Sequence, residues 1–221
     1  MSETDSFIDE VTEEVRRDRL FALMRKYGWI GILIVVLIVG GAAWNEWRKA
    51  RDRAEAQAFG DSVLAALKAE DPARRLEKLD EMAATVAEEP GRLAVTRLLA
   101  ADEALRAGDR AGALERVQAV AEEPGLPASL RQLAQLKAVI LAGPDMPAAE
   151  REAILSELAA PGAPYRALAM EEQALALLAA GQRDEAVAML RRILEEPDLT
   201  QGLQSRVSQL IVVLGGEAAA G

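Results

Sequence analysis

Two stretches of the chain decide its fold: residues 101–124, ADEALRAGDRAGALERVQAVAEEP, and residues 174–197, ALALLAAGQRDEAVAMLRRILEEP. They share small and apolar residues, a glycine and a closing Glu-Glu-Pro at a constant offset of 73 residues. Glycine and proline interrupt helices, and the segments between them are rich in good helix formers. Each stretch therefore predicts two helices joined by a turn. The matched residues are Ala101, Gly108, Ala113, Leu114, Val117, Val120 and Pro124 in the first stretch, and Ala174, Gly181, Ala186, Val187, Leu190, Ile193 and Pro197 in the second.

The closing proline recurs along the chain. Pro90, Pro124, Pro161 and Pro197 lie at spacings of 34, 37 and 36 residues. Such a period is typical of helical arrays, in which each two-helix unit buries its apolar face against its neighbours. The small residues and the glycine in the turn are similar to those of the tetratricopeptide repeat. The alternative is a set of unrelated helical hairpins in an alanine-rich chain.

We therefore predict an all-α protein whose residues 46–214 form a tetratricopeptide-repeat-like, right-handed array of antiparallel helix pairs. The unit that closes at Pro161 inserts residues 144–147 in its turn, and the unit that closes at Pro90 lacks the glycine. Residues 215–221 are expected to be a disordered tail. The last helix should cap the array by burying Leu203, Val207, Leu210 and Ile211. The expected helices span residues 54–69, 73–88, 91–107, 110–121, 127–142, 147–159, 165–180, 183–195 and 199–214.

An uncharged stretch, residues 27–45, precedes the array and reads YGWIGILIVVLIVGGAAWN. As a helix it reaches about 28 Å, close to the ~30 Å hydrocarbon core of a bilayer. It is therefore predicted to be a transmembrane helix. The alternatives are a signal peptide cleaved near residues 41–43, which the long acidic leader disfavours, and a buried helix of a soluble core. Aromatic side chains mark both ends as membrane-interface anchors: Tyr27, Trp29, Trp44 and Trp47.

Residues 1–26 form a charged leader, predicted to contain an amphipathic helix that begins at Ser6. Five basic residues precede the apolar stretch and four follow it closely, a small difference that favours a cytoplasmic N-terminus. Helix formers continue from residue 46 to 69 and are interrupted only by Gly60. The membrane helix is thus expected to continue as a stiff stalk into the first helix of the array.

The composition argues against enzyme chemistry and nucleic-acid binding. The chain has a formal net charge of −10, no histidine and no cysteine. It lacks the basic surface that phosphates require, an imidazole base, a thiolate nucleophile and the two commonest zinc ligands. We expect no enzyme activity, no cofactor, no metal, no small-molecule substrate and no nucleic acid, and instead predict protein partners.

A repeat array offers a concave surface lined by the first helix of each unit. An apolar groove of this kind can hold a peptide or an amphipathic helix. The alternative is that several of the leucines belong to the core. The candidate groove residues are Val95, Leu98, Asp102 and Leu105 in one unit, and Leu168, Glu171, Leu175 and Leu178 in the other.

The layout of a charged leader with the run Glu13-Glu14-Val15-Arg16-Arg17-Asp18-Arg19-Leu20, one anchor and degenerate repeats resembles the YfgM-like proteins, ancillary subunits of the Sec translocon. The resemblance implies an anchor in the bacterial inner membrane, a cytoplasmic N-terminus and a periplasmic repeat domain. It also implies association with the SecYEG channel, a membrane-bound periplasmic chaperone and exported polypeptides. The alternative is a membrane-anchored scaffold for envelope-assembly or cell-division complexes.

Overall fold

The computed structural model describes the backbone of residues 3–215 and the side chains of residues 25, 26, 29–31 and 33–215. Between residues 3 and 215 the regular structure is entirely helical. The chain divides into two compact units, Met1–Ser62 and Val63–Gly221, and each is described by itself. The expected disordered tail, apart from Gly215, and the apolar face expected for the leader helix lie outside the described residues.

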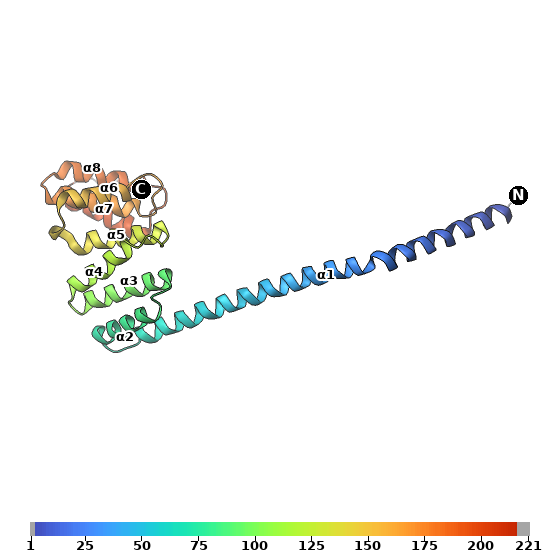
Figure 1. Ribbon diagram of the computed structural model, residues 1–221. Helices are drawn as coiled ribbons and strands as arrows, with labels where there is room; N and C mark the ends of the chain where they lie inside the picture. The colour runs from blue at the N-terminus through green and yellow to red at the C-terminus, as the bar shows by residue number, and fades with distance from the viewer. Residues whose placement is uncertain (1–2, 216–221) are drawn as a thin grey trace. The chain divides into compact units, whose positions relative to one another are not determined.

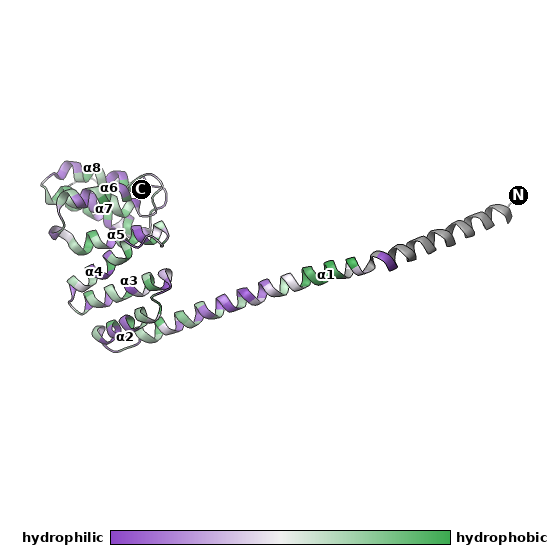
Figure 2. Ribbon diagram, in the orientation of Figure 1, coloured by the Kyte–Doolittle hydropathy of each residue, from purple (hydrophilic) through white to green (hydrophobic). Residues whose placement is uncertain are grey.

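The first helix, α1, runs from Glu3 to Leu67 without a break (Figure 1). The expectation that Ser6 caps a separate leader helix is therefore wrong, because the backbone is already helical at Glu3. Gly60 also stays helical, as its small propensity cost allows. Figure 2 shows an apolar stretch of α1 followed by a hydrophilic one. In the hydrophilic stretch, Arg51 pairs with Glu55 at 2.8 Å, four residues along the same helix.

Eight α-helices and one short 3-10 helix follow in the described part of the second unit. Apart from α1, each α-helix begins and ends within three residues of its expected bounds. The turn inserted before α6 contains the 3-10 helix η1. The elements are α2 Pro72–Thr85, α3 Pro90–Arg106, α4 Arg110–Ala121, α5 Ala128–Ala142, η1 Gly143–Asp145, α6 Ala148–Leu158, α7 Arg166–Ala179, α8 Arg183–Leu194 and α9 Gln201–Val213 (Figure 1).

Short polar side chains begin three of these helices by accepting hydrogen bonds from otherwise unpaired backbone N–H groups. Asp71 accepts from the backbone N–H of Arg74, and Asp109 accepts from that of Gly112, each at 2.8 Å. Thr200 caps α9 in the same way. These caps place the helix starts, and hence the turns between paired helices.

Glycines at positive φ end α3 and α7. Gly108 has φ +87° and Gly181 has φ +78°, a region that other residues enter only with strain. The residue after each glycine donates its N–H back into the helix, from Asp109 to the Ala104 carbonyl at 2.8 Å and from Gln182 to the Leu177 carbonyl at 2.9 Å. This is the Schellman arrangement, and it turns the chain into the second helix of each pair.

We expect Gly181→Ala to lower the free energy of unfolding by about 1–2 kcal/mol, because alanine must adopt a left-handed backbone there. Gly202→Ala is the matched control, since Gly202 lies in α9 and has open space around its Cα. Alanine should leave stability there unchanged or raise it by up to about 1 kcal/mol. Urea unfolding followed by circular dichroism compares the two variants, and equal losses would contradict this account of the turn.

The second unit is stabilised by a row of small hydrophobic clusters. Leu76 contacts the cluster around Leu79 and Ala100 and also the next cluster, around Val117. Leu114 joins that cluster to the following one, and Leu168 joins the following one to the last. Each helix pair therefore buries its apolar face mainly against its neighbours, as in a repeat array.

Helix α9 buries one face against the last cluster. Leu203, Val207 and Ile211 are buried, and Leu210 is partly buried against the same cluster. The burial predicted for this helix is thus confirmed for three of its four residues. The residues of the two matched stretches also share their burial: Ala113, Val117 and Val120 are buried in one pair, and Ala186, Leu190 and Ile193 in the other.

Candidate functional site

The exposed large hydrophobic side chains of the second unit have an uneven distribution. Among its described residues, all of them lie on odd-numbered helices, and none lies on α2, α4, α6 or α8. The odd-numbered helices are the first helices of the successive pairs, so one side of each pair carries all of this exposed apolar surface. These residues are Leu64 on α1, Val95 and Leu105 on α3, Ile140 on α5, Leu175 on α7, and Val212 and Val213 on α9.

The structure separates the eight predicted groove residues into four groups. Val95, Leu105 and Leu175 are exposed, and Leu168 and Leu178 are partly buried. Leu98 instead belongs to the core, in one cluster with Ala134 and Ala138 of α5, as the core alternative expected. The two acidic members, Asp102 and Glu171, form ion pairs.

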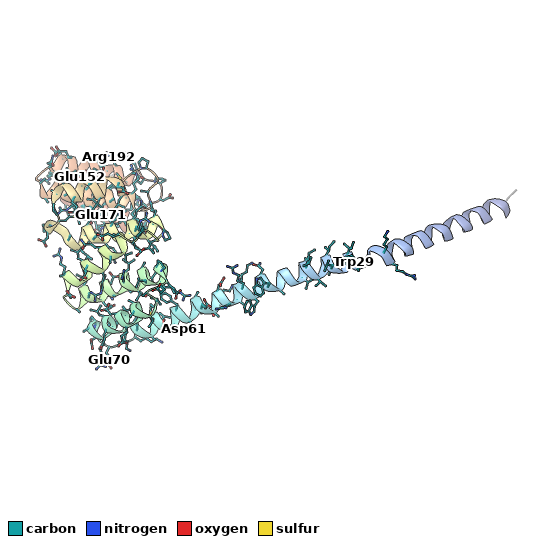
Figure 3. The ribbon with its side chains drawn as sticks, in the orientation of Figure 1. Trp29, Asp61, Glu70, Glu152, Glu171 and Arg192 are labelled. Carbon is teal, nitrogen blue, oxygen red and sulfur yellow. The ribbon has the colours of Figure 1, made fainter. Side chains whose placement is uncertain are left out.

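These ion pairs connect first helices of neighbouring pairs. Asp102 on α3 binds Lys137 on α5, with 2.6 Å between Oδ1 and Nζ. Glu171 on α7 binds Arg206 on α9 through both carboxylate oxygens, with each contact at 2.6 Å. Figure 3 labels Glu171 in the repeat unit. Because these acids already have basic partners, their main effect is to hold adjacent first helices in register.

Glu172, next to Glu171, has no such partner. Among the described residues, none forms an ion pair or a hydrogen bond with its half-buried carboxylate. Burial raises the pKa of Glu172 above its ordinary value and Glu171 raises it further, whereas Arg151 and Arg206 act in the opposite direction. A negative charge at Glu172 is therefore incompletely neutralised.

Sequence reasoning missed Ile140, Lys137 and Glu172. Lys137 and Ile140 lie on α5, which the offset of 73 residues does not align, and Glu172 lies next to Glu171, the acidic residue that the pattern singled out. One signal was available: Ile140 lies three residues before Gly143, as Leu105 lies three before Gly108. Both glycines have positive φ and follow a first helix, so counting back from each glycine would have found Ile140.

Pockets elsewhere in the repeat unit offer fewer groups for binding or catalysis. One lies between α6, α7 and α8, lined by Arg151, Glu152 and Gln173 among others. The Arg151 guanidinium there donates to the carbonyls of Gly143 and Met146, which fixes the turn before α6. Among the side chains that the structure describes, no three acidic, histidine or cysteine residues gather as a metal site would require.

Within the first unit, three of the four predicted interface aromatics can be located. Trp29, which Figure 3 labels, is exposed on α1, and so are Trp44 and Trp47. The ring centroids of Trp44 and Trp47 lie 5.2 Å apart. The side chain of Tyr27 lies outside the described residues. In the described part of the chain, one helical segment, Trp29–Leu67, is long and apolar enough to cross a membrane, and its apolar window is unburied.

A comparison of the chain with models of known protein families identifies its family. The model of the tetratricopeptide repeat-like domain matches residues 24–209. The chain belongs to this family. The match begins before the apolar stretch and ends within α9, so it includes the exposed first-helix residues except Val212 and Val213. Comparisons with curated proteins and with solved structures find no match. Tetratricopeptide repeat-like domains generally mediate protein–protein interactions, which suggests protein binding for this chain.

Proposed function

We propose that this protein is a single-span, non-enzymatic protein of the bacterial inner membrane that binds other proteins through its repeat domain. The carrying observation is that all exposed large hydrophobics of the described repeat unit lie on first helices. We call the exposed large hydrophobic side chains of α3, α5 and α7 the first-helix surface; they are Val95, Leu105, Ile140 and Leu175. Exposed apolar side chains that recur on one side of successive repeats are typical of a binding surface.

The membrane assignment rests on α1. The described side chains of its apolar stretch are exposed, and burying them in lipid would remove that surface from water. A single helix satisfies its own backbone hydrogen bonds in the bilayer. Tryptophans at both ends of the stretch suit the two membrane–water interfaces. We propose that the N-terminus is cytoplasmic and the repeat domain periplasmic.

We further propose that the partners are the SecYEG translocon, a membrane-bound periplasmic chaperone and exported polypeptides, so that the protein acts as a chaperone or adaptor in protein translocation. The support is the resemblance of the whole layout to YfgM-like proteins. An apolar binding surface would also suit exported chains, which are still unfolded and rich in exposed hydrophobic residues as they emerge.

Protease accessibility tests the topology. In intact cells the repeat domain should resist added protease, and it should be digested once the outer membrane is opened. Continued protection in spheroplasts, with a periplasmic control protein digested, would contradict the periplasmic assignment.

Crosslinking in cells followed by purification tests the partners. We expect to recover the Sec channel together with many different exported chains. Recovery of a few fixed envelope-assembly or division proteins, without the channel, would instead favour the scaffold function.

A further inference from the structure

We propose that the first-helix surface takes an amphipathic segment of a partner protein, one that places a lysine or arginine beside Glu172 and apolar side chains on Leu105, Ile140 and Leu175. This inference deepens the proposed function and rests on it, because it names the chemistry of the segment that is bound.

The apolar part of the proposal rests on exposed side chains of three successive first helices. Leu105 and Ile140 each lie three residues before the glycine that ends their helix, whereas Leu175 lies about one helical turn earlier, six residues before Gly181. Their exposed fractions are 45%, 51% and 39%, although each is a large hydrophobic residue in an otherwise well-buried array. One such residue on a surface needs no explanation, but exposed apolar residues on three successive first helices offer apolar area to a partner. An amphipathic segment can cover such residues while its polar side stays in water.

The basic part of the proposal rests on the charges beside those residues. Asp102 and Lys137 neutralise each other, and so do Glu171 and Arg206. Glu172 forms no ion pair or hydrogen bond with any described residue, although Arg151 and Arg206 attract its charge from beyond ion-pair distance, and it is half-buried next to a second carboxylate. A half-buried carboxylate gains more from a cationic partner than an exposed one does, because it has lost part of its hydration.

The position of Glu172 joins these two parts. It lies four residues after Leu168 and three before Leu175, and residues at these spacings share one face of a helix. A segment that covers Leu175 therefore passes close to the Glu172 carboxylate. An acidic residue at that point of the segment would be repelled by Glu172, whereas a lysine or arginine would be attracted.

The test uses the full chain in nanodiscs of zwitterionic lipid and two fluorescent model peptides. Both are alanine-based amphipathic helices with leucines along one face. One carries lysine beside the leucines, and the other carries glutamate at the same positions. Fluorescence anisotropy measures binding, and the signal with empty nanodiscs is subtracted. The wild-type chain should bind the lysine peptide about tenfold more tightly than the glutamate peptide.

Glu172→Gln should weaken binding of the lysine peptide about tenfold and bring the two peptides within about twofold of each other. The matched control is Glu157→Gln, which removes an exposed acid from α6 and should change neither affinity. Unchanged lysine-peptide binding by Glu172→Gln would overturn the inference, as would equal losses in both variants.

A second variant, Ile140→Ser, separates this inference from the proposed function. If Ile140→Ser abolishes binding but Glu172→Gln does not, the apolar surface stands and the basic partner is rejected. If neither change affects binding, the first-helix surface is not the binding surface, and both proposals fail. Self-association of the chain that excludes either peptide would mean that a second copy covers the surface, which also overturns the inference.

Discussion

Replacing Ile34 and Leu37 by arginine is expected to release the protein from membranes. Both side chains are exposed on α1, within its apolar stretch. Each arginine near the centre of a membrane helix opposes insertion by about 2.5–3.5 kcal/mol, so the pair opposes it by roughly 6 kcal/mol. The measurement is alkaline carbonate extraction of membranes. The wild type should stay in the pellet, and the double variant should appear in the soluble fraction.

The control adds the same charge at the same spacing farther along the same helix. Ala54→Arg with Gln57→Arg changes exposed positions in the hydrophilic stretch of α1. This variant should remain in the membrane, because the apolar stretch is intact. If the wild type is itself extracted, or if the Ile34 and Leu37 variant resists extraction, residues 27–45 are not a transmembrane anchor.

Glu103→Ala is expected to be the most damaging single substitution at a charged residue of the array, with a loss of about 3 kcal/mol in the free energy of unfolding. The Glu103 side chain is only 2% exposed and binds two arginines. Its Oε2 lies 2.7 Å from Nε of Arg75 on α2, and Arg106 binds the other oxygen. Arg75 also donates to the carbonyl of Ala69, after the end of α1. Alanine would leave the largely buried Arg75 without its charge partner.

Arg106→Ala is the matched control, since Arg106 is 61% exposed and its loss leaves the Arg75–Glu103 pair in place. It should cost less than about 1 kcal/mol. Hydrogen exchange would show where the damage falls: Glu103→Ala should speed exchange in α2 and α3 and leave α8 unchanged, because units of an array contact only their neighbours. Similar losses in the two variants would contradict this role of Glu103.

The helices could be predicted from the sequence because their boundaries carry chemical signals. Gly108 and Gly181 end first helices, Asp109 and Thr200 begin later ones, and alanine-rich segments between them have high helix propensity. The array followed from the recurrence of proline at a repeat-like period. The family match to residues 24–209 supports that prediction. The right-handed twist of the array and the domain boundaries remain predictions.

The binding surface could be predicted only in part, because the face of a helix does not determine what covers it. Leu98 occupies the same face as Val95 and Leu105, but it lies in the cluster that contains α5 residues. The Asp102–Lys137 and Glu171–Arg206 pairs each join residues 35 positions apart. Such partners depend on how successive first helices stack on one another. The pattern of residues along one helix does not reveal that stacking.

The most direct test of a protein-binding first-helix surface is crosslinking at single positions in living cells. A photoreactive phenylalanine analogue would replace Ile140, which is exposed on α5, or Gln118, which is exposed on the second helix α4. After irradiation, the Ile140 position should give protein adducts, and the Gln118 position should give few or none. Adducts that form equally from both positions, or only from Gln118, would contradict the assignment of binding to the first helices.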